Sequence, residues 1–310
     1  MPFIYSAKYY ADIGLHVFPV IKYRLIYDRL TGRDGGASTD GSVVSTRDFL
    51  SPEPASEKEL LLVHTPEYLD DLRNCRWTER TAYSELPITP EIVHLFELAC
   101  GGTILASRQA VQKGWAVHLS GGFHHTFADK AEGFCYLNDL AVAARVMQND
   151  NVVEKVAVID CDLHQGNGTA KIFHGDETVY TFSIHQGDLY PVKQESDWDI
   201  HLPMHVEDED YLRHLHHAIP RILDDFRPEL VLYQAGADPY KNDQLGSLAL
   251  TIEGLQARDQ FIFRECKKRA LPVAVTLGGG YAYNTNDTVQ IHLNTCKAAL
   301  EVVGRLRNSG

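Results

Sequence analysis

The stretch "KVAVIDCDLHQGNG", residues 155–168, joins an apolar strand pattern to a polar, glycine-rich turn. Apolar residues run to Ile159, after which Asp160, Asp162 and His164 stand at every second position. Side chains of an extended segment alternate between two faces, so these three would point to one side. Two carboxylates that share a side repel each other unless a positive group lies between them. The stretch therefore predicts a buried strand that ends at a site for a cation.

Four further apolar runs have the length of strands, and helix-length segments separate them. The runs cover residues 115–120, 178–185, 229–236 and 272–279, and the helical segments cover 90–112, 138–149, 207–226 and 252–270. Strands that alternate with helices favour a mostly parallel sheet that is covered by helices on both faces. The sequence therefore predicts an α/β fold.

Length and composition limit the class of protein to which the chain can belong. The chain has 310 residues, 44% hydrophobic and 23% charged, which is typical of a soluble globular protein. The net charge of −13 argues against direct nucleic-acid binding, which needs a basic footprint. No apolar run approaches the ~18 residues that cross a membrane. The polar stretch 31–48 is a predicted surface loop that comes too early to link two domains, so we expect one domain over residues 1–310.

Cysteine usage indicates a reducing compartment. The six cysteines show no CxxC pair and no regular spacing, and several lie in apolar runs. We therefore expect free thiols and a cytoplasmic protein, or a nuclear one if the source is eukaryotic.

Chemically active residues follow the ends of four predicted strands. In open α/β sheets, ligands bind outside the carboxyl ends of the strands, and glycine lets the backbone approach them closely. These strand ends carry Gly121-Gly122 before His124-His125, Asp160 through His164, Gly236 before Asp238, and Gly278-Gly279-Gly280 before Tyr281. We expect all four to meet at one site.

Asp162, His164 and Asp238 are the predicted metal ligands. Two carboxylates and one imidazole with an open position suit catalytic zinc, and Fe²⁺ or Mn²⁺ would also accept this donor set. A divalent ion lowers the pKa of a bound water and polarises a carbonyl, which are the needs of amide or ester hydrolysis. His124 or His125 would take the proton of the water, and the phenol of Tyr281 would stabilise the oxyanion.

With these residues in place, the sequence resembles the zinc-dependent histone deacetylase family from about residue 3 to residue 300. The motifs are "SGGFHHTFADKAEGFCYLNDLAVA", "VIDCDLHQGNGTAKIF", "YQAGADPY" with "DQLGSLALT", and "LGGGY". The form "DLHQGNG", with Gln165, is most similar to the class IV branch. The resemblance implies an arginase/deacetylase fold, with a mostly parallel sheet of about eight strands flanked by helices.

By position, the resemblance implies a role for each residue of these motifs. The implied zinc ligands are Asp162, His164 and Asp238. The implied catalytic residues are His124, His125, Tyr281, Asp160, which pairs with His124, and Asn167. The implied substrate-binding residues are Gly133, Phe134, Tyr190 and Gly279. The implied potassium ligands are Asp160, Asp162, His164, Ser183 and Ile184.

Asn167 departs from the pattern of the class I enzymes, which carry an aspartate at this position. A carboxylate partner favours the charged imidazolium, whereas a neutral amide does not. We therefore expect His125 to be the general base and then the general acid, with His124 as its electrostatic partner.

The predicted activity is zinc-dependent hydrolysis of acyl groups, acetyl or longer, from lysine side chains of a protein or peptide. One alternative is an amidohydrolase of small acylated amines such as acetylpolyamines. Another is a catalytically inactive module that binds acyl-lysine. A two-metal arginase-type site is disfavoured, because Pro239 and Tyr240 follow Asp238 in place of a second carboxylate.

Overall fold

The computed structural model describes residues 1–33 and 44–304. Of the predicted surface loop 31–48, residues 34–43 lie outside this part, residue 31 ends a helix, and Thr46–Asp48 form a 3₁₀ turn. The strands are β1 (Phe3–Ile4), β2 (Phe49–Leu50), β3 (Trp115–His118), β4 (Val156–Asp160), β5 (Val179–Gln186), β6 (Trp198–Leu202), β7 (Leu230–Gln234) and β8 (Val273–Thr276).

The helices of the described part include one at each of the four predicted helical segments and further helices outside them. They are α1 (Lys22–Thr31), α2 (Glu57–Leu60), α3 (Pro66–Arg73), α4 (Pro90–Lys113), α5 (Asp139–Asn149), α6 (Asn167–Phe173), α7 (Asp208–Asp225), α8 (Ile252–Lys268) and α9 (Thr285–Val302). Side-chain caps fix several starts: Thr89, Asn138 and Thr251 each accept a hydrogen bond from the first turn of α4, α5 and α8. None of these helices is long and apolar enough to cross a membrane.

All pairings in the eight-stranded sheet are parallel, which confirms the predicted α/β class. The strand order is β2-β1-β3-β8-β7-β4-β5-β6. After β3 the chain skips two positions to form β4, and β7 and β8 later fill this gap. The four strands that were predicted to carry the site are therefore the four adjacent central ones, β3-β8-β7-β4.

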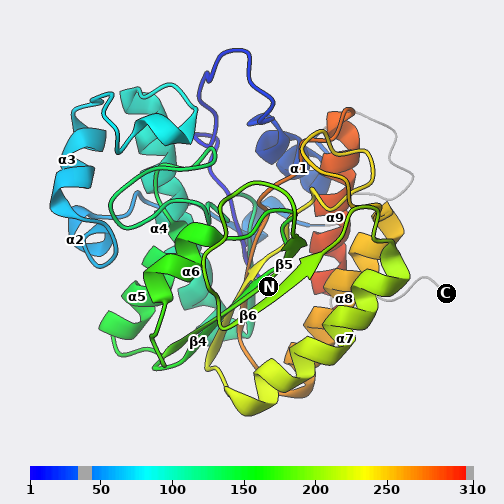
Figure 1. Cartoon of the computed structure of the whole chain (residues 1–310). Helices are drawn as coiled ribbons and strands as arrows, with labels where there is room; N and C mark the ends of the chain where they lie inside the picture. Colours follow the sequence, from blue (N-terminus) through cyan, green and yellow to red (C-terminus); the bar gives the residue numbers. More distant parts are fainter. Residues whose placement is uncertain (34–43, 305–310) are drawn as a thin grey trace.

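Helices cover both faces of the sheet (Figure 1). Helices α4 and α5 pack against each other on one side, with α6 beside them, whereas α8 packs between α7 and α9 on the other side. Helix α1 packs on α9. The central strands β3, β4, β7 and β8 are buried along their whole length, as their continuous apolar runs require.

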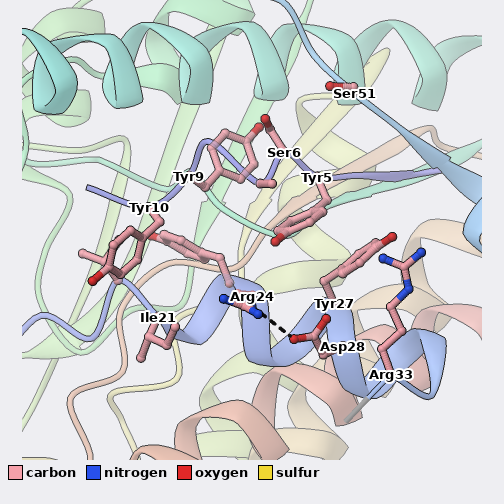
Figure 2. A pocket seen from close by; sticks show the side chains of 13 residues that line it. Tyr5, Ser6, Tyr9, Tyr10, Ile21, Arg24, Tyr27, Asp28, Arg33 and Ser51 are labelled. Atoms are coloured by element: carbon pink, nitrogen blue, oxygen red, sulfur yellow. Dashed lines mark ion pairs between the residues drawn. The ribbon is translucent and has the colours of Figure 1, made fainter. Parts of the chain in front are cut away.

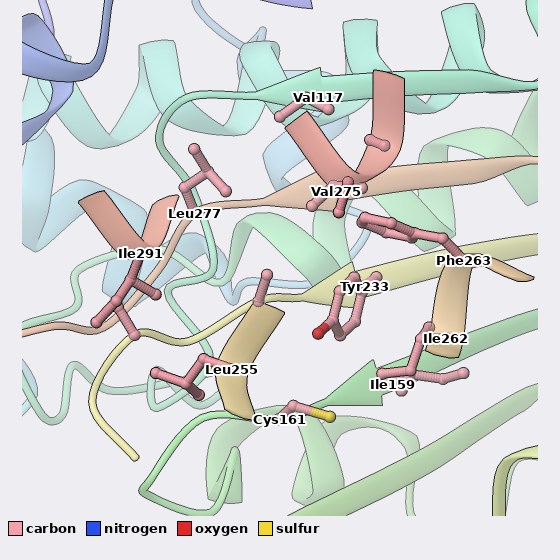
Figure 3. Packing of buried hydrophobic residues seen from close by; sticks show 14 of the residues in the cluster. Val117, Ile159, Cys161, Tyr233, Leu255, Ile262, Phe263, Val275, Leu277 and Ile291 are labelled. Atoms are coloured by element: carbon pink, nitrogen blue, oxygen red, sulfur yellow. The ribbon is translucent and has the colours of Figure 1, made fainter. Parts of the chain in front are cut away.

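The core on the α8–α9 side explains why the central strands are held firmly. Ile159, Tyr233 and Val275, from β4, β7 and β8, belong to one cluster with Leu255 and Phe263 of α8 (Figure 3). All five side chains are fully buried. Burial of one such apolar side chain contributes roughly 1.5–3 kcal/mol, so the cluster fixes the strand ends that carry the site. The six cysteines are free thiols, as predicted.

The strand register aligns one row of polar residues at the carboxyl edge. His118 pairs with Thr276, Thr276 with Gln234, and Gln234 with Asp160. The loops that leave β3, β8, β7 and β4 therefore start at the same level of the sheet. This common level brings residues far apart in the sequence into one site.

Candidate active site

Asp162, His164 and Asp238 lie together at this edge. Their potential ligand atoms all lie within 4.8 Å of one another, and all three residues are buried. His164 Nδ1 lies 3.4 Å from Asp162 Oδ1 and 3.5 Å from Asp238 Oδ2. Asp238 Oδ2 is buried without a hydrogen-bond donor, which is costly for a carboxylate unless a cation pairs with it. Two carboxylates, one imidazole and this unsatisfied oxygen fit a divalent metal ion.

Electrostatics at this group also favour a cation. Although burial works in the opposite direction, the nearby carboxylates of Asp162 and Asp238 raise the pKa of His164 to about 10. A metal ion binds the neutral imidazole, so binding must displace the proton that the carboxylates otherwise hold there.

Glycines let two loops close on the carboxylates. Gly279 has φ +55°, and a Cβ there would lie 2.5 Å from Asp162 Oδ2 and 2.7 Å from Asp238 Cγ. A Cβ on Gly236 would lie 2.6 Å from the Cα of Asp162. The structure thus places Gly279, a predicted substrate residue, directly against the metal group.

The loop after β3 carries the histidine pair, and its turn depends on glycine. Gly121 and Gly122 have φ values of +78° and +79°, and a Cβ on Gly122 would lie 2.1 Å from Gln234 Oε1. The start of α5 clamps the same loop, because Asp139 accepts hydrogen bonds from the N–H groups of Gly122 and Phe123 at 3.0 and 2.7 Å. His124 and His125 are therefore carried on a rigid loop.

The two histidines have different partners. His124 Nδ1 lies 2.6 Å from Asp160 Oδ2, and His125 Nδ1 lies 2.8 Å from Asn167 Oδ1. The two Nε2 atoms are 3.1 Å apart. This is the pairing that the resemblance implied for both residues.

The pKa shifts of the two histidines are opposite. Burial alone would lower the pKa of His124, but the carboxylates of Asp160 and Asp162 together raise it to about 9. Burial, with the neighbouring His124 and His164, lowers the pKa of His125 well below its usual value. At neutral pH, His125 is the neutral member of the pair and can accept a proton.

A cavity of about 200 Å³ is lined by His125 of the histidine pair and by His164 of the proposed metal ligands. Phe134 and Tyr190 form aromatic walls: the Phe134 ring lies 5.7 Å from that of Tyr281, and the Tyr190 ring 5.4 Å from that of His125. Gly133, with φ +54°, lies between the walls, because a Cβ there would meet both His125 and Tyr190. The predicted channel residues Gly133, Phe134 and Tyr190 thus share one cavity.

Tyr281 lines this cavity together with His164, and it lines a smaller cavity together with Asp162. Burial, and then the charges of Asp238 and Asp162, raise the pKa of its phenol well above the usual value. The phenol therefore stays protonated and is able to donate a hydrogen bond.

Two of the predicted potassium ligands, Ser183 and Ile184, lie on β5, next to β4. Ser183 pairs with Asp160 in the register between β4 and β5, and the next residue on β5 is Ile184. The Ser183 hydroxyl lies 2.9 Å from Nδ1 of His185. Ser183 and Asp160 are therefore neighbours in the sheet, and the Ser183 hydroxyl is already engaged by a histidine.

Sequence reasoning missed several residues of the site. Lys22 is buried at the start of α1 and donates to the carbonyl oxygen of Gly279. Burial lowers its pKa to about 8, against the raising effect of Asp238. The signal that could have found it is a lone lysine in the apolar run "FPVIKY", residues 18–23. Asp243 and Glu132, which also contact site residues, have no comparable local signal.

A larger cavity lies away from the predicted site residues. It has a volume of about 760 Å³ and is lined by tyrosines and two arginines of the N-terminal segment and α1, among them Tyr5, Tyr27 and Arg33 (Figure 2). None of the predicted site residues lines it. Its size therefore carries no weight for the function of the Asp162 region.

A parallel α/β sheet that carries an Asp–His–Asp group beside a histidine pair is the arrangement of a metal-dependent hydrolase. The chain belongs to the histone deacetylase domain family, whose model matches residues 16–296.

Individual relatives support this membership. An uncharacterized protein of Picosynechococcus sp. is 36% identical over 315 residues, which cover 97% of this chain and 99% of that protein. Histone deacetylase 2 of Arabidopsis thaliana is 32% identical, over 90% of this chain and 74% of that protein. A crystal structure of an HDAC homolog complexed with SAHA has a TM-score of 0.81 at 22% identity, covering 96% of this chain and 83% of that one, and confirms the fold.

Proposed function

We propose that this protein is a zinc-dependent deacylase that removes acyl groups from lysine side chains, with residues 1–310 acting as one catalytic domain. The observation that carries the proposal is a single cavity that is lined by the aromatic rings of Phe134 and Tyr190 and also by His125, His164 and Tyr281. A long aliphatic side chain that ends in an amide fits between two aromatic faces. The reactive groups stand where that amide would arrive.

Each residue has one task in the hydrolysis. Asp162, His164 and Asp238 would hold the zinc ion, which when bound supplies a Lewis acid that acidifies water and polarises an amide carbonyl. His125 takes a proton from the attacking water at Nε2 and later delivers it to the departing amine nitrogen. The products are a carboxylate and a free lysine amine. His124, held by Asp160, keeps positive charge beside the reacting centre.

Tyr281 and the channel walls complete the proposed mechanism. The protonated phenol of Tyr281 donates a hydrogen bond to the oxygen on which negative charge develops. Phe134 and Tyr190 exclude water from the aliphatic part of the substrate and orient the amide. As a further part of the proposal, potassium binds at Asp160, Asp162, His164, Ser183 and Ile184, and activity would then depend on K⁺ at fixed ionic strength.

The decisive experiment is a panel of lysine peptides that carry acetyl through myristoyl groups, assayed with the zinc-loaded protein. Turnover of any of them supports the deacylase, and zinc binding without turnover favours the module that only binds acyl-lysine. The similarity of "DLHQGNG" to the class IV branch is the basis for proposing that longer acyl groups are preferred. A higher kcat/KM for acetyl-lysine than for myristoyl-lysine would contradict that preference.

Glu85 favours a second candidate, hydrolysis of small acetylated amines. This exposed carboxylate lines the same cavity as Phe134 and Tyr190, where it could pair with the cationic nitrogen of a polyamine. Acetylspermidine assayed beside the acetyl-lysine peptide separates the candidates. A kcat/KM that is higher for acetylspermidine, and that falls in Glu85→Gln, would assign the protein to this class.

A further inference from the structure

Glu132 contacts Asn167, the partner of His125, and both of its carboxylate oxygens have polar contacts. Its Oε1 accepts hydrogen bonds from Nδ2 of Asn167 at 2.9 Å and from the hydroxyl of Tyr190 at 3.4 Å. Its Oε2 lies 3.2 Å from Nζ of Lys130. The side chain is 14% exposed, so water competes little for these contacts. Glu132 is therefore hydrogen-bonded to Asn167, whose amide oxygen contacts Nδ1 of His125.

The backbone around Glu132 is also fixed. Its carbonyl oxygen accepts a hydrogen bond from the N–H of Cys135 at 3.1 Å, and these two residues form an isolated β-bridge. Asn167 is buried at the first position of α6. The two side chains thus meet from two rigid segments, and their contact is not a feature of a free loop.

Donor and acceptor chemistry fixes the direction of each hydrogen bond in the series Glu132–Asn167–His125. An ionised carboxylate can only accept, so the amide of Asn167 must turn its NH₂ group toward Glu132. The amide oxygen then faces His125 Nδ1 at 2.8 Å, and because this oxygen can only accept, Nδ1 must carry the proton. The lone pair of neutral His125 is then on Nε2, the nitrogen that lies 3.1 Å from Nε2 of His124. Without the carboxylate, the amide could turn by 180° and favour the other tautomer.

We propose that Glu132 is a positioning residue that orients Asn167 and thereby holds His125 in the tautomer of a general base. This inference rests on the proposed function, in which His125 is the base. Positions 132 and 167 then form a functional pair of one carboxylate and one amide. The pair keeps a neutral group next to His125 and the negative charge one residue farther away.

The pairing makes a prediction about exchange of the two groups. Asn167→Asp alone sets two carboxylates against each other at the 2.9 Å contact, which is unfavourable unless one takes up a proton. In the double variant Glu132→Gln/Asn167→Asp, the amide introduced at position 132 would donate to the carboxylate introduced at position 167. That carboxylate would in turn accept from His125 Nδ1. The double variant should therefore recover kcat by about 10-fold or more over Asn167→Asp.

Glu132→Leu tests the anchor itself. It removes the acceptor at similar size and should lower kcat by roughly 10–100-fold, within the range of an acid–base contribution, with KM little changed. Lys130→Met is the matched control, because its ammonium group contacts Oε2 of Glu132, which does not contact Asn167, and otherwise lies over the rings of Phe127 and Tyr83. We expect this variant to change kcat by less than about threefold. A wild-type kcat in Glu132→Leu would overturn the proposal. So would a kcat of the double variant Glu132→Gln/Asn167→Asp that equals the product of the fold-changes caused by its two single substitutions.

Two further readouts separate positioning from a general loss of structure. In the double variant, a carboxylate directly at His125 should move the acidic limb of the kcat–pH profile to higher pH, because the base must be neutral. The other titratable groups that face His125 are His124, His164, Asp238 and Tyr190. The wild-type profile under the same conditions accounts for their contributions.

Nitrogen NMR of the zinc-loaded protein reports the tautomer without any substrate, with the signals of His125 assigned from a His125→Gln variant. The wild type should show the Nδ1–H form, and Glu132→Leu should show the Nε2–H form or an average. If no acyl-lysine is turned over, the proposed function fails, while the NMR result still decides the role of Glu132. An unchanged Nδ1–H form in Glu132→Leu would overturn that role.

Discussion

The carboxylate of Asp243 accepts a 2.7 Å hydrogen bond from the backbone N–H of Tyr281. Its other oxygen accepts from the N–H of Leu245 at 2.9 Å. The contact ties the segment after β7 to the segment after β8, so the tyrosine backbone is held independently of its phenol. A substitution that removes only the hydroxyl group should therefore leave the position of the ring unchanged.

Tyr281→Phe should lower kcat without loss of structure or metal. A donor aimed at a developing oxyanion is typically worth ~10²–10³ in kcat, or roughly 2.7–4 kcal/mol. KM should change little, because the hydrogen bond strengthens mainly in the transition state. Steady-state kinetics and zinc content check this, with Tyr283→Phe as the control at an exposed tyrosine two residues away. A kcat within about threefold of wild type, with chemistry rate-limiting, would exclude Tyr281 from the mechanism.

Asp238→Ala should lose both the metal and the activity. The substitution removes one of the three proposed ligands and the buried oxygen that lacks a hydrogen-bond donor. Elemental analysis after dialysis checks the metal, and Asp210→Ala, at an exposed carboxylate of α7, is the control. One full zinc equivalent in Asp238→Ala would refute the ligand assignment. Zinc binding by the wild type should also release a proton, because the carboxylates hold His164 protonated.

The sequence predicted the layers of the fold because its signals are local. The runs 155–162 and 229–236 became β4 and β7, and the segment 252–270 became α8, each within two residues at either end. The two-residue strands β1 and β2 were missed, since two residues are too short to show a periodicity, and the edge strand β6 was also missed. The eight-strand total therefore came from family resemblance.

The site residues also divide into those that a local sequence pattern reveals and those that it does not. Asp162, His164 and Asp238 were found because each follows a strand and shares a glycine-rich turn with its neighbours. Glu132 and Lys22 act through contacts with residues 35 and 257 positions away along the chain. No local pattern shows such a pairing, because it arises only when the loops meet above the sheet.

Gly133→Ala should impair catalysis more than stability alone explains. A Cβ at this position would lie 2.6 Å from Cδ2 of His125 and 2.8 Å from the hydroxyl of Tyr190, so the base must move. We expect kcat to fall by about 10-fold or more, as misplacement of a reacting group is costly. Gly175→Ala is the matched control: its φ is also positive, at +77°, but nothing lies within 4 Å of the added Cβ. Equal kcat values for the two variants would contradict the proposed contact.

His64 should make the folded protein sensitive to acid. The residue is buried, and its Nε2 accepts a hydrogen bond from the N–H of Asn138, the residue that caps α5, at 3.1 Å. Burial lowers the pKa of His64 to about 4, whereas the unfolded chain titrates near ~6.5. At a pH between these two pKa values, His64 is protonated in the unfolded chain and neutral in the folded protein. The free energy of unfolding therefore falls as the pH falls from about 6.5 toward 4, by up to ~1.4 kcal/mol per pH unit.

His64→Gln isolates this contribution, because its amide oxygen can still accept from Asn138 but does not titrate. Urea unfolding at pH 7, 6 and 5 should show a shallower decline for the variant than for the wild type, in which His118, also buried with a lowered pKa, contributes the same sign. The comparison of the two proteins cancels the groups that they share. His214→Gln, at a histidine exposed in both states, should follow the wild type. Parallel declines for His64→Gln and the wild type would show that His64 does not set the acid sensitivity.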